Sequence, residues 1–236
     1  MFNQYRVLAV VPARGGSKGI PGKNLKSIRG LSLVARAARA IAEAGIADRA
    51  VCSTDDPAIA REAHAAGLEA ANLRPAELAT DQAKSVDVWR HSWLAAEAAD
   101  GVTYDLSILV EPTSPLRRAE DLVATVRRMI DTGAKAAATI SPTPGHFTPH
   151  KTLTMGDDGR VGFYLEGGGR FARRQDIPPY YHRNGVCYAA RRATIVEDGT
   201  IVEDDCAAVL IDRPLVNIDE PLDLDIAGLL AAREAW

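Results

Sequence analysis

Residues 7–24 of the chain read VLAVVPARGGSKGIPGKN. The first five are apolar and mostly β-branched, which is typical of a strand buried on both faces of a parallel sheet. A loop with four glycines and three cations follows this strand directly. A glycine-rich turn after a strand presents backbone N–H groups to phosphate, and Arg and Lys side chains add positive charge. The stretch therefore predicts a polyphosphate-binding loop at the carboxyl end of a buried strand.

Two better-known phosphate loops are excluded by their spacing. The Walker A motif, GxxxxGK[ST], would need a glycine at Ser17 and a Ser or Thr at Asn24. The dinucleotide fingerprint, GxGxxG, has only its last two glycines in place. A merely solvated surface loop is the structural alternative, but it does not explain why glycines and cations gather directly after a buried strand.

Strand and helix patterns alternate along most of the chain with short connections. This alternation predicts an α/β fold with a doubly wound, mainly parallel sheet. We expect strands at 7–11, 49–54, 106–110, 136–140, 185–190 and 207–211, and helices at 33–44, 58–66, 86–99, 119–131 and from 221 onward.

Residues 142–185 break this pattern. They are rich in Pro, Gly, His and Tyr and show no helical period. An irregular excursion of about 40 residues is uncommon unless it is functional or packs on something. We therefore expect residues 1–236 to form a single domain in which 142–185 is an inserted arm, and we expect that arm to favour a homodimer.

The composition bounds the partners and the compartment. The chain has 236 residues and a formal net charge of -3, so no global positive field draws it to nucleic acid. Its apolar runs are too short for a signal peptide or a membrane span. Cys52, Cys187 and Cys206 are widely spaced and odd in number, which indicates thiols of a reducing, cytoplasmic compartment. His146 and His150 lie among prolines, which excludes a zinc site on a helix face.

The loop resembles that of the acidic-sugar cytidylyltransferases, the CMP-sialic acid synthetase (acylneuraminate cytidylyltransferase) family. The family signature is a strand followed by Ala-Arg-x-x-Ser-Lys-Gly-x-Pro-x-Lys-Asn, and residues 13–24 fit every fixed position. Further matching segments follow in order along almost the whole chain: STD at 53–55, LRPAELATD at 73–81, PTSPLR at 112–117, RQ at 174–175, NG at 184–185 and ID at 218–219.

The resemblance implies a Rossmann-like nucleotidyltransferase fold with a dimerisation arm, and it implies the reaction. The anomeric hydroxyl of a 2-keto-3-deoxy sugar acid would attack the α-phosphate of CTP and release pyrophosphate. Such a transfer needs positioning and charge neutralisation more than covalent chemistry. By the resemblance, the catalytic residues are Arg14, Lys18, Lys23 and Asp219, and the nucleotide-binding residues are Ala13, Arg14, Gly15, Ser17, Lys18, Asn24, Arg74 and Ser85.

Three of these assignments have a structural alternative. Asn24 is able to close a turn, Arg74 precedes a proline in an extended segment, and Ser85 is able to cap a helix. Each alternative is reasonable alone, but the loop and the distant matching segments together favour the nucleotide.

The metal end of the site departs from the family pattern. The family holds Mg²⁺ or Mn²⁺ with two Asp residues that flank one residue, on the last strand before a helix. Here the segment supplies Asn217 and Asp219, so one carboxylate is replaced by an amide. We expect Asp219 to bind the metal with Asn217 as an uncharged neighbour. The alternative is that Asp219 only begins the helix ahead of Pro221.

The sugar end is expected to bind a carboxylate and several hydroxyls. By the resemblance, the residues near the sugar are Glu111, Lys151, Arg174, Tyr181 and His182, with Arg174 reaching across the dimer interface. The rings at 180–182 have the alternative role of burying the arm against a partner subunit. The family commonly has Gln at 111 and Arg-Pro at 182–183. These departures favour a nonulosonic acid other than plain N-acetylneuraminic acid.

Two other functions stay open at this point. One is a cytidylyltransferase for an eight-carbon acid such as 3-deoxy-manno-octulosonate, although the segment at 73–78 is closer to the nine-carbon branch. The other is a catalytically weak nucleotide-binding protein, which Asn217 and Glu111 suggest.

Overall fold

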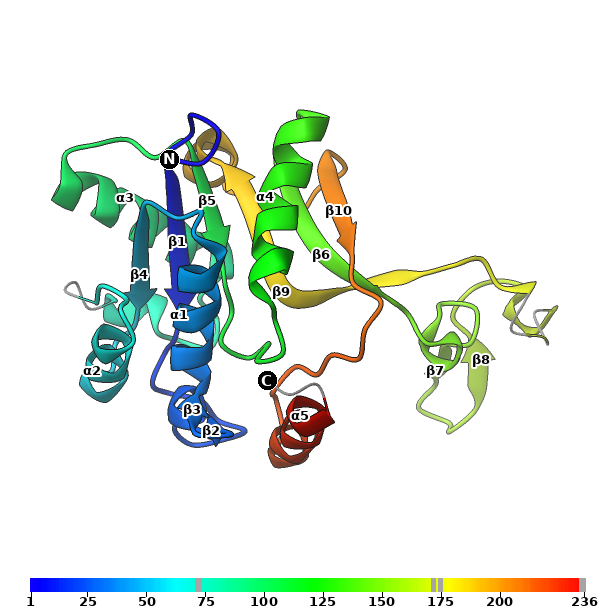
Figure 1. Cartoon of the computed structure of the whole chain (residues 1–236). Coiled ribbons are helices and arrows are strands. Elements are labelled where there is room, and N and C mark those ends of the chain that lie inside the picture. The colour runs from blue at the N-terminus through cyan, green and yellow to red at the C-terminus, as the bar shows by residue number, and fades with distance from the viewer. Residues whose placement is uncertain (71–73, 171–172, 174–175, 234–236) are drawn as a thin grey trace. The chain divides into compact units, whose positions relative to one another are not determined.

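A six-stranded sheet forms the centre of the computed structural model, which describes residues 1–70, 74–170, 173 and 176–233 (Figure 1). Its strand order is β10-β6-β9-β5-β1-β4. The strands are β1 (Val7–Pro12), β4 (Arg49–Ser53), β5 (Leu106–Leu109), β6 (Ala136–Pro142), β9 (Tyr181–Arg191) and β10 (Cys206–Leu210). The six strands expected from the sequence are all formed.

Strand β1 lies between β4 and β5 in the sheet. It pairs in parallel with β4 on one side and with β5 on the other, so that Val10 lies opposite both Val51 and Leu109. After β1 the chain forms β4 on one side of it, and it then crosses to form β5 on the other side. This reversal of strand order creates a switch point between β1 and β5. Strand β9 pairs antiparallel with β5 and lies between β5 and β6. The alternation in the sequence did not predict this insertion.

The five expected helices are present as α1 to α5. Three of them end at a glycine in the left-handed conformation, which is the usual end of a helix. Ser32 caps the amino end of helix α1, because its hydroxyl accepts a hydrogen bond from the Ala35 N–H at 3.1 Å. The helices are α1 (Leu33–Ala44), α2 (Pro57–Ala65), α3 (Ser85–Asp100), α4 (Ala119–Thr132) and α5 (Pro221–Arg233).

Several short elements complete the fold. The hairpin of β2 (Ser27–Ile28) and β3 (Leu31–Ser32) leads into α1. Single helical turns are η1 (Lys23–Leu25), η2 (Ala76–Leu78), η3 (Gly145–Phe147), η4 (Gly168–Arg170) and the π-turn η6 (Thr194–Asp198).

Helices cover both faces of the sheet. In Figure 1, α1 and α4 pack against each other in front of it. Helix α3 packs on β1, and its Trp89 and Trp93 share a buried cluster with Leu8 and Val10. Alternate residues of a strand point to opposite faces, so Val7, Ala9 and Val11 point toward the other layer. All of β1 up to Val11 is therefore buried, as the continuous apolar run predicts.

The chain divides into two compact units. The larger comprises residues 1–139, 184–209 and 213–236, and the smaller comprises 140–183 and 210–212. Within the smaller unit, β7 (Leu153–Met155) and β8 (Val161–Phe163) form an antiparallel hairpin. Exposed apolar side chains gather in this unit: Phe147, Leu153, Met155, Val161, Phe163, Tyr164 and Tyr181.

The three cysteines are free thiols. Burial raises the pKa of Cys52 and of Cys187 to about 12, so neither is a reactive thiolate at neutral pH. Among the described residues, no helix is long and apolar enough to cross a lipid bilayer.

Candidate active site

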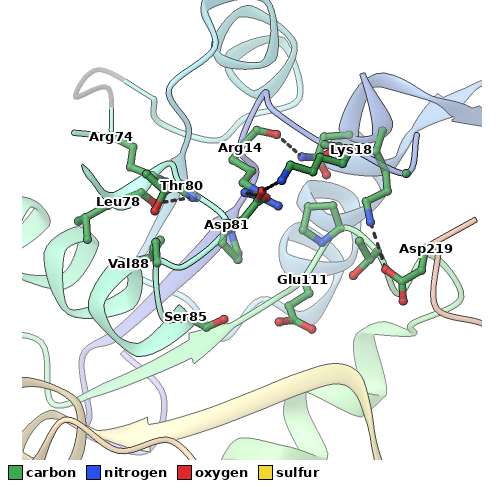
Figure 2. Close-up of a pocket in the computed structure, with 18 residues that line it drawn as sticks. Arg14, Lys18, Arg74, Leu78, Thr80, Asp81, Ser85, Val88, Glu111 and Asp219 are labelled. Atoms are coloured by element: carbon green, nitrogen blue, oxygen red, sulfur yellow. Dashed lines mark hydrogen bonds and ion pairs between the residues drawn. The ribbon is translucent and has the colours of Figure 1, made fainter. Parts of the chain in front are cut away.

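A cavity of about 410 Å³ opens in the larger unit (Figure 2). The segments that follow β1 and β5 both contribute to it, which places it at the switch point of the sheet. In open α/β sheets this is where ligands bind. The lining residues are Pro12, Arg14, Ser17, Lys18, Gly19, Lys23, Asn24, Arg74, Leu78, Thr80, Asp81, Ala83, Ser85, Val88, Glu111, Pro112, Thr113 and Asp219.

The loop after β1 brings its three cations to this cavity. Arg14 and Lys18 both form ion pairs with the Asp81 carboxylate, Arg14 Nη1 at 2.6 Å from Oδ1 and Lys18 Nζ on Oδ2. The hydrogen bonds from Lys18 and from Arg14 lower the pKa of Asp81, so it stays ionised well below neutral pH. Figure 2 shows the three side chains meeting inside the cavity.

Lys23 is fixed from the far end of the chain. Its Nζ donates to the Ile218 carbonyl at 2.8 Å and to Asp219 Oδ1 at 3.2 Å. The Asp219 backbone is held in turn by Asp223, whose Oδ2 accepts from the N–H groups of Asp219 and Glu220. These two hydrogen bonds lower the pKa of Asp223. The arrangement sets a carboxylate, 77% exposed, beside the loop's last lysine.

Two features let the loop reach this position. A Cβ on Gly19 would lie 2.7 Å from the Asp219 carbonyl oxygen, so only glycine allows the loop to approach residue 219 so closely. Asn24 is buried, and its Nδ2 donates to the Arg14 carbonyl at 2.9 Å. Asn24 therefore closes the loop as its structural alternative proposed, and it also lines the cavity.

The predicted backbone donors at the start of the loop have protein partners. The Ala13 N–H donates to the Ser53 carbonyl at 2.9 Å, and the Gly15 N–H donates to Asp55 Oδ1 at 2.9 Å. Neither Ala13 nor Gly15 lines the cavity, whereas Ser17 does. The hydrogen bond to Asp55 accounts for the STD segment at 53–55, because it ties the end of β4 to the loop.

Arg74 and Ser85 also line the cavity, from the segments that follow β4 and begin α3. Arg74 is buried and spans the end of β4, donating from Nε to Ser53 Oγ at 3.1 Å and from Nη2 to the Ser53 carbonyl at 2.6 Å. Burial lowers its pKa. Ser85 is the first residue of α3, so the amino end of that helix faces the cavity, and helix amino ends favour anions.

The loop after β5 brings Glu111 to the cavity and is anchored by a buried arginine. Arg117 donates from Nη2 to the Glu111 carbonyl and from Nε to the Val186 carbonyl at 3.0 Å. Burial lowers the pKa of Arg117 to about 10, which still leaves it charged at neutral pH. Arg117 therefore fixes the backbone on which Glu111 stands.

Glu111 lies close to Asn217. A Cβ on Gly185 would lie 2.9 Å from Glu111 Oε2, 2.9 Å from Ser114 Oγ and 3.3 Å from Asn217 Nδ2, so these groups converge on one backbone position. The Ser114 hydroxyl donates to Asn217 Oδ1 at 2.7 Å. Asn217 does not itself line the cavity. Its predicted place near the metal stays a prediction, and its carbonyl oxygen is already engaged by Ser114.

The remaining sugar-side predictions fall outside this cavity. Lys151 and His182 belong to the smaller unit, as does Tyr181, and His182 Nδ1 lies 3.2 Å from Thr143 Oγ1 within that unit. Arg174 lies outside the described residues. The cavity thus brings together Arg14, Ser17, Lys18, Lys23, Asn24, Arg74, Ser85, Glu111 and Asp219 among the predicted site residues.

The donor set around Asp219 fits a hard divalent cation shared with substrate phosphates. Among the described residues, no three His, Cys, Asp or Glu side chains gather into a protein metal cage. Mg²⁺ is commonly held without one, by one or two carboxylates plus phosphate oxygens. The exposed carboxylate of Asp219 meets that requirement at the rim of a cationic cavity.

Sequence reasoning missed several residues of the cavity. Asp81, Thr80 and Thr113 all lie in segments that match the family, but the motifs assigned them no role. A signal for Asp81 was present, since it is an acid four residues before Ser85 in a segment expected at the nucleotide.

A mainly parallel α/β sheet with a cationic cavity at its switch point is typical of proteins that bind anionic ligands such as nucleotides, the class to which the nucleotidyltransferases belong. A family model described as cytidylyltransferase matches residues 8–195. The chain therefore belongs to the cytidylyltransferases, in the CMP-sialic acid synthetase family that its motifs resemble.

Curated relatives share about a quarter of their residues with this chain. The CMP-N,N'-diacetyllegionaminic acid synthase of Legionella pneumophila is 29% identical over 226 residues, covering 92% of this chain and 93% of the relative. A pseudaminic acid cytidylyltransferase of Campylobacter jejuni is 27% identical over 224 residues, covering 94% and 95%.

The fold has a solved counterpart. The structure of CMP:2-keto-3-deoxy-manno-octonic acid synthetase complexed with CTP superposes with a TM-score of 0.72 and 19% identity, covering 97% of this chain and 99% of that one. At this identity the likeness concerns the fold alone. It confirms the predicted α/β nucleotidyltransferase fold.

Proposed function

We propose that this protein joins CTP to a nonulosonic acid and releases the CMP-sugar and pyrophosphate. The observation that carries the proposal is the gathering of Arg14, Lys18 and Lys23 in one cavity, together with Arg74 and beside Asp219. A triphosphate needs several cations to neutralise its charge, and the chain, acidic overall, gathers these at one edge of its sheet.

The nucleotide lies in this proposal between the loop and α3. Arg14, Lys18 and Lys23 neutralise the triphosphate and the charge that develops on departing pyrophosphate. Arg74 and Ser85 hold the nucleoside end, and Arg74 is pre-oriented because Ser53 and Leu78 fix its guanidinium. Fixed donors lose little entropy on binding, so these residues position the α-phosphate for in-line attack.

We further propose Mg²⁺, or Mn²⁺, as the cofactor, held by Asp219. When bound, the ion would neutralise phosphate charge and help to orient the triphosphate. Lys23 fixes the Asp219 carboxylate from one side, while Asp223 fixes its backbone from the other. Asn217 would contribute to the metal site without charge, because its side chain is an amide and not a carboxylate. Its amide oxygen accepts a hydrogen bond from Ser114.

The sugar acid is proposed to be a nonulosonic acid other than plain N-acetylneuraminic acid. Glu111 is the group that supports this choice, because its carboxylate would repel the substrate carboxylate but would accept from hydroxyl, amide or amino substituents. Relatives named for legionaminic and pseudaminic acids agree with the choice. Lys151, Arg174, Tyr181 and His182 are proposed to complete the sugar site.

We also propose a homodimer that uses the smaller unit. Phe147, Met155 and Val161 are 76%, 75% and 64% exposed there, and a gathering of exposed apolar side chains is typical of an interface. Light scattering tests this: the wild-type chain is expected at twice its formula mass, and Met155→Lys with Val161→Lys at the monomer mass. A monomeric wild type would overturn it.

The free thiols favour a reducing compartment, and we propose the cytoplasm.

Pyrophosphate release tests the function. The assay combines CTP and Mg²⁺ with legionaminic, pseudaminic, N-acetylneuraminic and 3-deoxy-manno-octulosonic acids. We expect release with a nonulosonic acid and a kcat/KM for plain N-acetylneuraminate well below the best substrate. Release with the eight-carbon acid alone would move the enzyme to the other branch. No release with any acid, but measurable CTP binding, would favour the weak nucleotide-binding protein.

Two variants test the metal assignment in the same assay. Asp219→Asn should raise the Mg²⁺ concentration needed for half-maximal rate, and unchanged Mg²⁺ dependence would contradict Asp219 as the ligand. Asn217→Asp asks whether a second carboxylate strengthens Mg²⁺ binding. Equilibrium binding of Mn²⁺ in the presence of CTP gives a readout that does not depend on turnover.

A further inference from the structure

Asp81 forms ion pairs with two of the cations that line the cavity, Arg14 and Lys18. Its two carboxylate oxygens form ion pairs with Arg14 and Lys18 separately, so that one acid pairs with two of the three cations of the loop and offsets part of their charge. The carboxylate belongs to residues 79–84, which connect η2 to α3 and carry two further lining residues, Thr80 and Ala83. This anion thus links residues 79–84 to the glycine-rich loop.

The ion pairs of Asp81 differ from the ion pair between Lys23 and Asp219. Lys23 is 17% exposed and is also held by the Ile218 carbonyl, so it stays in place whether or not Asp219 binds it. Lys18 is 83% exposed and Asp81 is 37% exposed, so their pair is held mainly by charge in a solvated setting. Exposed ion pairs of this kind are weak and are screened by salt. The pair of Lys18 with Asp81 is therefore readily exchanged, and the pair of Arg14 with Asp81 is partly solvated, since Arg14 is 32% exposed.

We propose that Asp81 is an internal competitor for the triphosphate, which holds Arg14 and Lys18 in position and releases them when the phosphates arrive. A triphosphate carries several charges and displaces a single carboxylate, but part of its binding free energy is spent on the exchange. After the transfer, Asp81 competes again for the same cations and favours the departure of pyrophosphate. Asp81 is thus a positioning residue that sets affinity for the phosphates at both ends of the reaction.

Binding of inorganic tripolyphosphate and of CTP tests this proposal, which rests on the proposed function for the phosphate-binding role of Arg14 and Lys18 and for the identity of the nucleotide. Calorimetric titrations compare the full-length wild type with Asp81→Asn and with Glu77→Gln. Glu77 is the matched control because it is an exposed acid of η2 that does not line the cavity, and its substitution changes the net charge equally. Circular dichroism checks that all three are folded.

Asp81→Asn is expected to bind tripolyphosphate and CTP about three- to tenfold more tightly than the wild type, the range of two weak exposed ion pairs. Glu77→Gln should bind as the wild type does. The gain should shrink when the salt concentration is raised from about 0.05 M to about 0.5 M, since salt screens the competing pairs. Product inhibition by pyrophosphate should strengthen by a similar factor, and Asp81→Glu should restore the wild-type values.

Equal or weaker binding of tripolyphosphate by Asp81→Asn would overturn the competition. The same would follow if Glu77→Gln gave the same gain, because the effect would then be one of net charge. Tripolyphosphate also separates the two proposals: tighter binding supports the competition even if no sugar acid is turned over, and equal binding refutes it even if the pyrophosphate assay succeeds.

Discussion

The loops that follow β1 and β5 bring an arginine each to the same edge of the sheet, and they use the charge in opposite ways. Arg14 lines the cavity with its guanidinium paired to an exchangeable carboxylate. Arg117 is 2% exposed and gives its hydrogen bonds to two backbone carbonyls. The charge of Arg14 is therefore available to a ligand, whereas Arg117 uses its guanidinium to hold two backbone carbonyls in place.

The difference predicts that the two loops tolerate substitution differently. A charge that meets a ligand has a solvated alternative partner, so its loss leaves the folded protein intact and removes function. A buried arginine that binds carbonyls leaves those carbonyls without donors when it is removed, so its loss destabilises the fold. Arg117, at the end of the PTSPLR segment, is therefore structural, whereas Glu111, just before the segment, lines the cavity.

The largest effect is expected from Arg117→Met. The carbonyls of Glu111 and Val186 would lose buried donors, which we expect to lower the free energy of unfolding by about 3 to 5 kcal/mol. Urea titration measures this. The control is Arg127→Met on the exposed side of α4, which should change the value by less than about 0.5 kcal/mol. A loss no larger than that of the control would remove the distinction between the two loops.

Lys18→Met should break the other half of the comparison. We expect kcat/KM for CTP to fall about 100-fold, or about 2.7 kcal/mol of transition-state stabilisation, with the unfolding free energy nearly unchanged. The matched control is Lys26→Met, an exposed lysine of the same loop region that does not line the cavity. Equal activity of the two variants would show that Lys18 is merely solvated.

Gly185→Ala sharpens the comparison on the β5 side. Gly185 has φ +69°, and the added methyl would also press on Glu111 Oε2 and Ser114 Oγ. We expect a loss of about 2 kcal/mol in the urea titration. Gly133→Ala isolates the backbone contribution, because Gly133 has φ +72° and nothing within 4 Å of its added Cβ, so about 1 kcal/mol is expected there. Equal losses would mean that the crowding around Gly185 is without consequence.

The smallest effect belongs to Asp223→Ala, next to the β1 side of the cavity. The N–H groups of Asp219 and Glu220 would lose their acceptor, at a cost of about 1 kcal/mol at neutral pH. The pKa of Asp223 is lowered in the folded protein, so its contribution is present above the unfolded pKa near about 4 and is lost as the pH falls through the folded value. Wild type and variant should therefore converge as the pH is lowered below about 3. A constant difference across that range would contradict the role of the ionised carboxylate.

Much of the fold was readable from local pattern. The run from Val7 to Val11 predicted β1, and Gly45 after an apolar period predicted the end of α1. The same patterns predicted a strand at 185–190 but not its direction or its place, since β9 lies antiparallel to β5, between β5 and β6. Its residues have the same local preferences as those of a parallel strand, so only the pairing across the sheet distinguishes the two.

The sequence by itself determined the succession of strands and helices along the chain, the cationic loop after β1 and the family that this loop resembles. These depend on propensities and spacings within a few turns of chain, and such information is local. Only the tertiary structure decided that Lys23 meets Asp219, 196 residues away, that Asp81 takes two of the cations and that Glu111 and Asn217 converge on Gly185. Those contacts depend on how distant loops pack at the edge of one sheet, and no periodicity along the chain encodes them.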